Sequence, residues 1–261
     1  MKMEMTRGMQ KSIAKHGSVL KAFRAQGGGG AGLMAGGIVL LVFGVPLGLL
    51  CLLSLGSSGL LVGAVFMAPG LLLILWGGAL RKKRLANYLE FYRKDTGYSE
   101  EELRQADREL MSPDAVKIGG KMDNSGGKNG IIFMITEHYF LSIWPVYGAH
   151  LRKLDDIVAA FHSAQIPGIG GYRQNLFVIS RQEIGKKGVE NPFTKKEYEG
   201  FECGMMSEQR HCQQTCAEAI EEMIRRAPHI ITNQNIAVDG VTYNLLSMNN
   251  WQEDWRRILG E

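Results

Sequence analysis

An uncharged stretch constrains the fold of this chain more than any other feature of its sequence. From Gln26 to Leu80 there is no Asp, Glu, Lys or Arg, whereas the rest of the 261 residues is ordinarily charged. Residues 31–55 and 60–80 within this stretch are mostly apolar. As helices that rise about 1.5 Å per residue, both are long enough to cross a hydrocarbon core of about 30 Å. The sequence therefore predicts two transmembrane helices.

The join between the two predicted spans is short and polar. Residues 56–59, Gly-Ser-Ser-Gly, leave no room for another element, so the spans are predicted to form a transmembrane hairpin. Two buried helices of a soluble core are the alternative, but core helices rarely run beyond about 18 residues without a charge. A cleaved signal peptide fits poorly, since its apolar region is about 7 to 15 residues long and here a second span follows at once.

Basic residues flank the predicted hairpin on both sides. Those before it are Lys2, Arg7, Lys11, Lys15, Lys21 and Arg24, and those after it are Arg81, Lys82, Lys83 and Arg84. Because Lys and Arg close to a span are retained in the cytoplasm, both termini are predicted to be cytoplasmic in a protein of the inner (plasma) membrane. The run from Arg81 to Arg84 is thus interpreted as a stop and orientation signal. The lipid bilayer is the first predicted partner.

A nucleic-acid role for this basic run would require a basic soluble face. Ten of the 30 Lys and Arg residues and one of the 26 Asp and Glu residues lie at or before residue 84, so 20 cations stand against 25 acidic residues after it. The formal net charge of +4 therefore arises beside the predicted spans, where it suits a membrane surface. No nucleic-acid partner is predicted.

Glycines recur along both predicted spans at spacings of about four or seven residues, which place them on one helical face. They are Gly37, Gly44, Gly48, Gly63, Gly70 and Gly77. Small residues on one face let helix backbones approach closely, so the spans are predicted to pack on each other or on another copy. Neither span has an ionisable group other than the thiol of Cys51, so no ion or proton relay is visible.

Changes in composition divide the chain into five predicted segments. They are a basic N-terminal segment with a glycine linker (1–30), the transmembrane hairpin (31–80), a basic stop and helical stalk (81–112), an α+β domain (113–231), and a C-terminal hairpin with an amphipathic helix (232–261). The first 26 residues suit either an interfacial helix on anionic lipid or a disordered basic tail. Ser99 and Glu102 have the spacing of a capping box, which predicts that a helix begins there.

The predicted α+β domain begins with short apolar runs separated by turn residues. Such runs indicate an antiparallel, hairpin-rich sheet. A long helix is predicted from Ser207 to Arg226, and Pro228 stops it. Its apolar residues fall at steps of three and four, which predicts one buried stripe. The predicted fold is an antiparallel sheet closed by a C-terminal helix.

Motifs in this domain resemble bacterial pleckstrin-homology-like (PH-like) domains. Residues 131–136 followed by 139–143 are similar to their "T-x-Y/F" hairpin, and Leu154-Asp155-Asp156-Ile157 is similar to their "L-x-D-I" strand start. A membrane hairpin before such a domain is similar to membrane proteins of Firmicutes-type bacteria, several of which have an element like residues 227–230, Ala-Pro-His-Ile. The resemblance covers about residues 115–231 and departs at 183–206, which is longer than a plain hairpin. It implies a cytosolic PH-like domain without a settled enzymatic activity.

Soft metal ligands gather around the start of the predicted long helix. They are Cys203, His211, Cys212 and Cys216. Cys212 and Cys216 both fall on the apolar stripe, and the spacing from Cys203 is not that of a zinc finger, so core cysteines are the first interpretation. A metal site and a redox or lipidated pair are the alternatives. No cofactor is predicted.

The predicted C-terminal helix carries Trp251 and Trp255 on one side. Packing onto the domain is the first interpretation. Docking to a protein partner or to the membrane surface is the second.

The sequence shows no P-loop, no G-x-G-x-x-G after a strand, no H-E-x-x-H, no G-x-S-x-G and no kinase signature. The predicted function is therefore a non-enzymatic, membrane-anchored protein that presents a PH-like interaction domain to a protein partner or to another copy. The alternative is a membrane enzyme or a metal or redox sensor that uses the cluster of Cys203, His211, Cys212 and Cys216.

Overall fold

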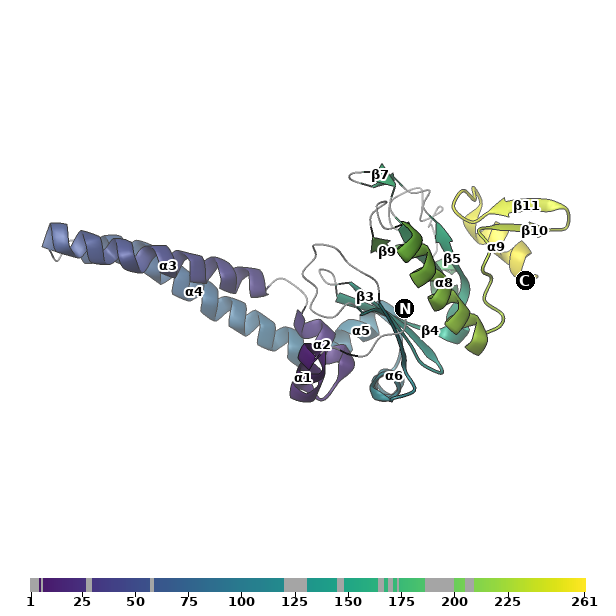
Figure 1. The fold of residues 1–261 in the computed structure, drawn as a ribbon, viewed down its shortest axis with the longest axis horizontal. Helices are drawn as coiled ribbons and strands as arrows, with labels where there is room; N and C mark the ends of the chain where they lie inside the picture. The colour runs from purple at the N-terminus through teal and green to yellow at the C-terminus, as the bar shows by residue number, and fades with distance from the viewer. Residues whose placement is uncertain are drawn as a thin grey trace.

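A computed structural model of the chain describes residues 5, 7–26, 30–56, 59–119, 131–144, 148–163, 167–168, 171–172, 174–185, 200–204 and 209–261. Within these residues, helices are combined with antiparallel sheets, which confirms the mixed α and β character predicted from the sequence. A pair of long helices projects from one end of an α+β body (Figure 1).

The projecting pair consists of α3 (Gly30–Leu55) and α4 (Gly59–Ala86), which lie side by side (Figure 1). We call this pair the rod. In the described part of the chain, one segment, Gly32–Ser54 of α3, is long and apolar enough to cross a membrane. Helix α4 joins its apolar stretch to the run Arg81–Arg84 without a break.

Helices α1 (Arg7–His16) and α2 (Val19–Gln26) pack onto the body beside the base of the rod. Their apolar residues Met9, Val19, Leu20, Ala22 and Phe23 are buried in a core shared with the helices that follow α4. The N-terminal segment is therefore part of the folded body. The structure contains neither the interfacial helix nor the disordered tail expected over the described residues 7–26.

The carboxylate of Asp107 caps the N-terminus of α2. Its Oδ1 accepts hydrogen bonds from the backbone N–H groups of Val19 and Leu20, at 2.8 and 3.0 Å. These donors belong to the first turn of a helix, where they have no intrahelical acceptor. Asp107 is itself buried, so this long-range cap ties the N-terminal helices to the body.

The helices predicted as a stalk instead cover one face of a sheet. Helix α5 (Tyr88–Thr96) leads into α6 (Glu100–Met111), which begins with the predicted capping box of Ser99 and Glu102. The sheet has the order β1-β2-β3-β4 and is antiparallel throughout, with bounds Val116–Gly119, Ile131–Ile135, Tyr139–Trp144 and Gly148–Lys153. Leu103 and Leu110 of α6 pack in the same core as Leu141 and Leu151 of the sheet. The boundary predicted at residue 113 therefore passes through one hydrophobic core.

A second antiparallel sheet follows the 3-10 turn η2 (Leu154–Asp156). Its order is β5-β8-β9, with bounds Ile157–Ser163, Gln174–Ser180 and Gly200–Gly204. The small hairpin of β6 (Pro167–Gly168) and β7 (Gly171–Tyr172) lies between β5 and β8 in the sequence, and α7 (Arg181–Ile184) follows β8.

Helix α8 (Gln209–Arg226) joins the two sheets through its apolar stripe. Cys216, Ala219 and Met223 share a core with Phe140 of the first sheet and Val178 of the second. The structure confirms the predicted helix and its buried stripe, because packing two sheets against one helical face needs apolar residues at steps of three and four.

The C-terminal residues cover the other face of the second sheet. Strands β10 (Asn235–Val238) and β11 (Val241–Asn244) form the predicted hairpin, and Asp239 and Gly240 both have positive φ in its turn, as a tight two-residue hairpin requires. Helix α9 (Trp251–Leu259) completes this layer.

We predict that Asp107→Ala releases the N-terminal helices from the body. Loss of two hydrogen bonds to a buried carboxylate should cost about 1–3 kcal/mol. Hydrogen exchange of the backbone amides in α1 and α2 should accelerate, while that of β5 and β8 should change much less. Glu101→Ala, on the exposed side of the same helix, is the control. Unchanged exchange in α2 would show that the cap does not hold these helices.

Candidate functional site

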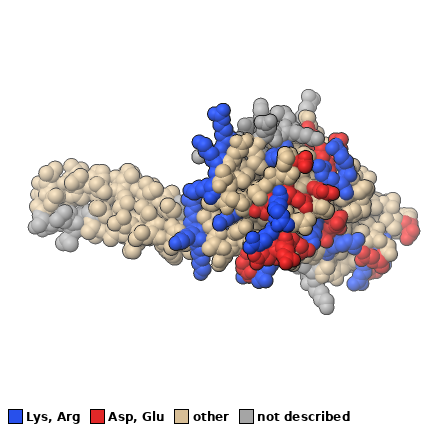
Figure 2. Space-filling model, turned by 90° about the horizontal axis from the view of Figure 1, so that it is seen from below, with Lys and Arg blue, Asp and Glu red and all other residues tan. Residues whose placement is uncertain are grey.

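Apolar side chains exposed on the rod are the most unusual surface feature of the molecule. Fourteen of the sixteen large apolar side chains found exposed among the described residues lie on α3 and α4, including Phe43 at 70% and Leu53 at 85% exposure. The face in Figure 2 shows no charged residues on the described part of the rod until its base, where Arg81–Arg84 begin. Soluble monomers rarely expose a continuous apolar patch beyond a few hundred Å². The rod is therefore suited to an apolar environment.

The candidate span in α3 does not have the burial of a core helix. Only 17% of its most apolar window is buried inside the molecule. A core helix of a soluble protein would be enclosed by other elements on most sides, whereas α3 contacts chiefly α4. The alternative of two buried core helices is thus contradicted for α3 within the described residues.

Two of the six predicted packing glycines form the closest contact within the rod. A Cβ atom on Gly37 would lie 2.5 Å from the carbonyl oxygen of Gly70 and 2.8 Å from Cγ1 of Ile74. A Cβ atom on Gly70 would lie 3.0 Å from the carbonyl oxygen of Gly37. Real Cβ atoms are essentially never found closer than about 3 Å to such atoms, so the helices approach this closely only because both residues are glycine.

The other predicted glycines are described only by their burial. Gly44 and Gly77 are buried and Gly48 is half-buried. The surroundings of Gly63 lie outside the described residues.

Cations gather where the rod meets the body, as Figure 2 shows. We call this group the basic collar, and its members are Lys15, His16, Lys21, Arg24, Arg81, Lys82, Lys83 and Arg84. The sequence predicted that Lys15, Lys21, Arg24 and Arg81–Arg84 flank the hairpin on the same side. The fold adds that α1 and α2 pack beside the base of α4, which fixes their positions. From Met5 to Leu89 the sequence contains no Asp or Glu.

Aromatic side chains of α5 support two of the collar cations. The guanidinium carbon of Arg24 lies 3.6 Å from the ring centroid of Phe91, and the Nζ atom of Lys21 lies 5.6 Å from that of Tyr88. Cation–π contacts of this kind hold a positive charge in place without neutralising it.

Burial and neighbouring cations both affect the pKa of two collar residues. Burial, and then the positive charges of Lys15, Lys21 and Arg81, lower the pKa of His16. Burial and the charge of Arg84 lower the pKa of Arg24. At both groups the neighbouring cations act in the same direction as burial, so positive charge is concentrated at the collar.

The Cys and His residues of the alternative metal site are only partly described. Cys203 lies in β9, and His211 and Cys212 lie in the first turn of α8, but their side chains are outside the described residues. Cys216 is buried in the core beneath α8, as its place on the apolar stripe predicted. No group of three or more His, Cys, Asp or Glu side chains suited to hold a metal occurs among the described residues.

Trp251 and Trp255 are core residues. They are 2% and 0% exposed, and their rings meet edge to face at 5.7 Å between centroids. The interpretation that they pack onto the domain is confirmed. The alternative, that they form an exposed docking surface, is wrong, because both indoles are covered by the second sheet and the C-terminal segment.

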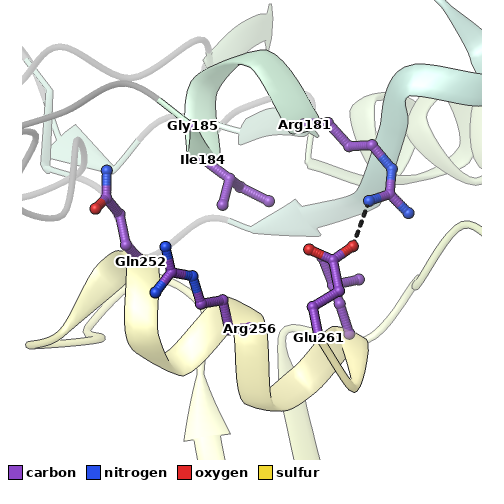
Figure 3. Close-up of a pocket in the computed structure, with 7 residues that line it drawn as sticks. Arg181, Ile184, Gly185, Gln252, Arg256 and Glu261 are labelled. Atoms are coloured by element: carbon purple, nitrogen blue, oxygen red, sulfur yellow. Dashed lines mark hydrogen bonds and ion pairs between the residues drawn. The ribbon is translucent and has the colours of Figure 1, made fainter.

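A hollow of about 280 Å³ lies between α7 and α9 (Figure 3). Its lining residues are Arg181, Ile184, Gly185, Gln252, Arg256, Leu259 and Glu261. Arg181 Nη1 donates a hydrogen bond of 2.6 Å to Glu261 Oε1, and both side chains are about half exposed. This exposed ion pair contributes little to stability, and the hollow contains no nucleophile paired with a base.

A buried ion network that the sequence did not predict joins α5, the first sheet and α7. Arg152 of β4 is almost fully buried and lies 3.3 Å from Asp95 and 3.6 Å from Glu183. Burial alone would raise the pKa of Asp95, but a hydrogen bond from His150 and the charge of Arg152 lower it overall. The network holds three elements together, which is a structural role.

Comparison of the chain with protein-family models, with curated proteins and with solved structures found no match. The resemblance to PH-like domains therefore stays a prediction from the sequence.

We predict that Gly37→Ala destabilises the rod and that Gly36→Ala does not. A Cβ atom on Gly36 would have no neighbour within 4 Å, so the two variants gain the same helix propensity but only Gly37→Ala forces the helices apart. We expect a loss of about 1–3 kcal/mol, measured as a lower thermal midpoint of the full chain in detergent. Equal midpoints for the two variants would mean that α3 and α4 do not pack as described.

Proposed function

We propose that the protein is anchored in the inner (plasma) membrane by the rod as a transmembrane hairpin, and that it presents its α+β body as a non-enzymatic interaction module on the cytoplasmic side. The observation that carries this proposal is the position of the exposed apolar surface, which fills the rod and ends at a collar of cations. A bilayer offers the same sequence of environments, an apolar core bounded by anionic headgroups.

The dimensions of the rod fit this role. The candidate span of 23 residues in α3 would extend about 35 Å as a helix, compared with about 30 Å for the hydrocarbon core. Helix α4 lies alongside it, and residues 60–80 of α4 contain no charge. A helix pair satisfies its own backbone hydrogen bonds, which an apolar environment requires.

The position of α1 and α2 argues against a cleaved signal peptide. These helices precede α3, and they supply Met9, Leu20 and Phe23 to the core of the body. Cleavage after α3 would remove them from the molecule and expose the surface that they cover.

The proposed orientation follows from the collar. Both ends of the rod that adjoin the body carry cations, and the joining turn carries none. Because basic residues beside a span favour the cytoplasmic side, the body and both termini are proposed to be cytoplasmic.

The arrangement of the body supports a PH-like interpretation of the domain. A four-stranded antiparallel sheet, a three-stranded antiparallel sheet and a helix packed against both match the sheet closed by a C-terminal helix that the sequence predicted. The proposed partner is another protein or a second copy of the chain. Attachment to the membrane raises the effective concentration of the module, so weak contacts become sufficient for binding.

Single-cysteine labelling tests the anchoring and orientation. In a background without the native cysteines, Ser58→Cys at the turn of the hairpin should react with a membrane-impermeant maleimide in intact cells. Lys94→Cys, at an exposed position of α5, should react only after permeabilisation. Recovery of the full chain in the soluble fraction, or equal labelling of the two positions, would contradict the proposal.

In-cell crosslinking tests the interaction role. The full chain, crosslinked, isolated and identified by mass spectrometry, should recover one defined protein partner or a crosslinked copy of itself. The control is the Gly37→Ala variant, which alters the rod and leaves the body unchanged. If neither a defined partner nor a second copy is recovered from wild-type cells, an interaction module is the wrong description of the body.

A further inference from the structure

The hollow between α7 and α9 has the features of a site for a carboxylate. Arg181 of α7 lines one side of it, and Arg256 of α9 lines the other (Figure 3). Its apolar lining residues, Ile184 and Leu259, are half-buried, so part of their surface is accessible to a ligand. Two guanidinium groups beside an apolar surface suit a carboxylate that is attached to an apolar group.

The chain itself shows that a carboxylate of a polypeptide fits this place. Glu261 follows the end of α9, and its Oε1 atom accepts a hydrogen bond of 2.6 Å from Nη1 of Arg181. The side chains of Arg181 and Glu261 are 52% and 54% exposed, so solvent reaches the pair. An exposed ion pair of this kind contributes little free energy, and a second carboxylate is able to replace it.

The side chain of Arg256 has no carboxylate partner among the described residues. It is exposed and extends from α9 toward α7 (Figure 3). On the same helix, Glu253 pairs with Arg257. Asp254 and Glu183 each accept a backbone N–H group at the start of their own helix. A ligand that enters the hollow therefore meets a guanidinium that no described carboxylate neutralises.

The size and position of the hollow favour a protein segment as the source of the carboxylate. Its volume of about 280 Å³ is just below the range of about 300–1,000 Å³ found for drug-sized ligands, which suits one or two side chains of a peptide. Helix α9 lies at the end of the body opposite the rod (Figure 1). In a protein anchored by the rod, this end faces away from the membrane and is open to a protein partner.

We propose that this hollow binds an acidic side chain of a protein partner between Arg181 and Arg256, and that Glu261 occupies Arg181 until the partner displaces it. An apolar residue next to the acidic one packs on Ile184 and Leu259. The inference rests on the proposed interaction role of the body, and it adds the place and the chemistry of the binding site.

Binding of a short peptide to the full chain in detergent tests the site. The probe has the sequence Gly-Ser-Leu-Glu-Leu-Ser-Gly with both ends blocked, so that its only charge is the Glu carboxylate, and its Kd is measured by titration calorimetry. A peptide with Gln in place of Glu is the control ligand. The full chain should bind the Glu peptide about tenfold more tightly, because only a carboxylate forms charge-assisted hydrogen bonds with both guanidinium groups.

Substitutions in the hollow should change this binding in opposite directions. Arg181→Gln and Arg256→Gln should each weaken binding of the Glu peptide about tenfold. Glu261→Gln should strengthen it about two- to fivefold, because it removes the competing carboxylate. In the Arg181→Gln background, Glu261→Gln should have no effect, since the competition acts through the guanidinium of Arg181.

Matched changes of charge on the same helix provide the controls. Arg257 and Glu253 form an exposed ion pair with each other, and neither residue lines the hollow. Arg257→Gln and Glu253→Gln should therefore leave the Kd within about twofold of that of the wild type. If Arg257→Gln weakened binding as much as Arg256→Gln, or Glu253→Gln strengthened it as much as Glu261→Gln, the effect would be general electrostatic attraction and the site would be overturned.

The outcomes separate this inference from the proposed function. Equal affinity for the Glu and Gln peptides, or no binding even to the Glu261→Gln variant, would overturn the hollow as the site. In cells, the double variant Arg181→Gln, Arg256→Gln should lose the crosslinked partner, whereas an unchanged partner would overturn the hollow and leave the interaction role intact. Displacement of the peptide by an equal concentration of free glutarate would assign the site to a small dicarboxylate and overturn the protein segment.

Discussion

The packing of α1 and α2 against α5 and α6 determines how the rest of the molecule is connected. Asp107 closes the start of α2, and Leu20 and Phe23 complete a core that the first sheet shares. Helix α3 follows α2 after a short glycine linker, and only Asn87 separates α4 from α5. Both ends of the rod are therefore held at one end of the body. Because these junctions are short and the helices beside them are packed, the rod and the body form one unit.

This connection also explains why the collar carries more charge than the run Arg81–Arg84. Lys21 and Arg24 are about 60 residues away from this run in the sequence. The hairpin brings both of its ends to one place, and packing of α2 beside α4 fixes the two residues there. The aromatic rings of α5 hold them there. The positions of these charges at the base of the rod are thus fixed by tertiary packing.

Local signals in the sequence predicted much of this fold. They did not predict the contacts between distant segments. The capping box at Ser99, the stripe of α8 and the turn at Asp239-Gly240 each depend on residues within one or two turns, so the sequence contains all that determines them. The packing of the N-terminal helices onto the body was not predicted, because it depends on a turn at Gly17 and on contacts with distant residues. With φ of 65°, Gly17 ends α1 in the left-handed conformation, and its N–H bonds to the carbonyl of Ile13. Burial of Arg152 beside Asp95 and packing of Arg24 over Phe91 depend on the tertiary fold, which local patterns do not encode.

The shared core has a consequence for how the anchor and the domain influence each other. A fragment that begins at residue 113 would lack α2, α5 and α6, and it would expose the face of the first sheet that carries Leu141 and Leu151. Such a fragment would bind proteins through a surface that the intact molecule buries. Experiments on the body therefore require the full chain, in which α2, α5 and α6 cover this face.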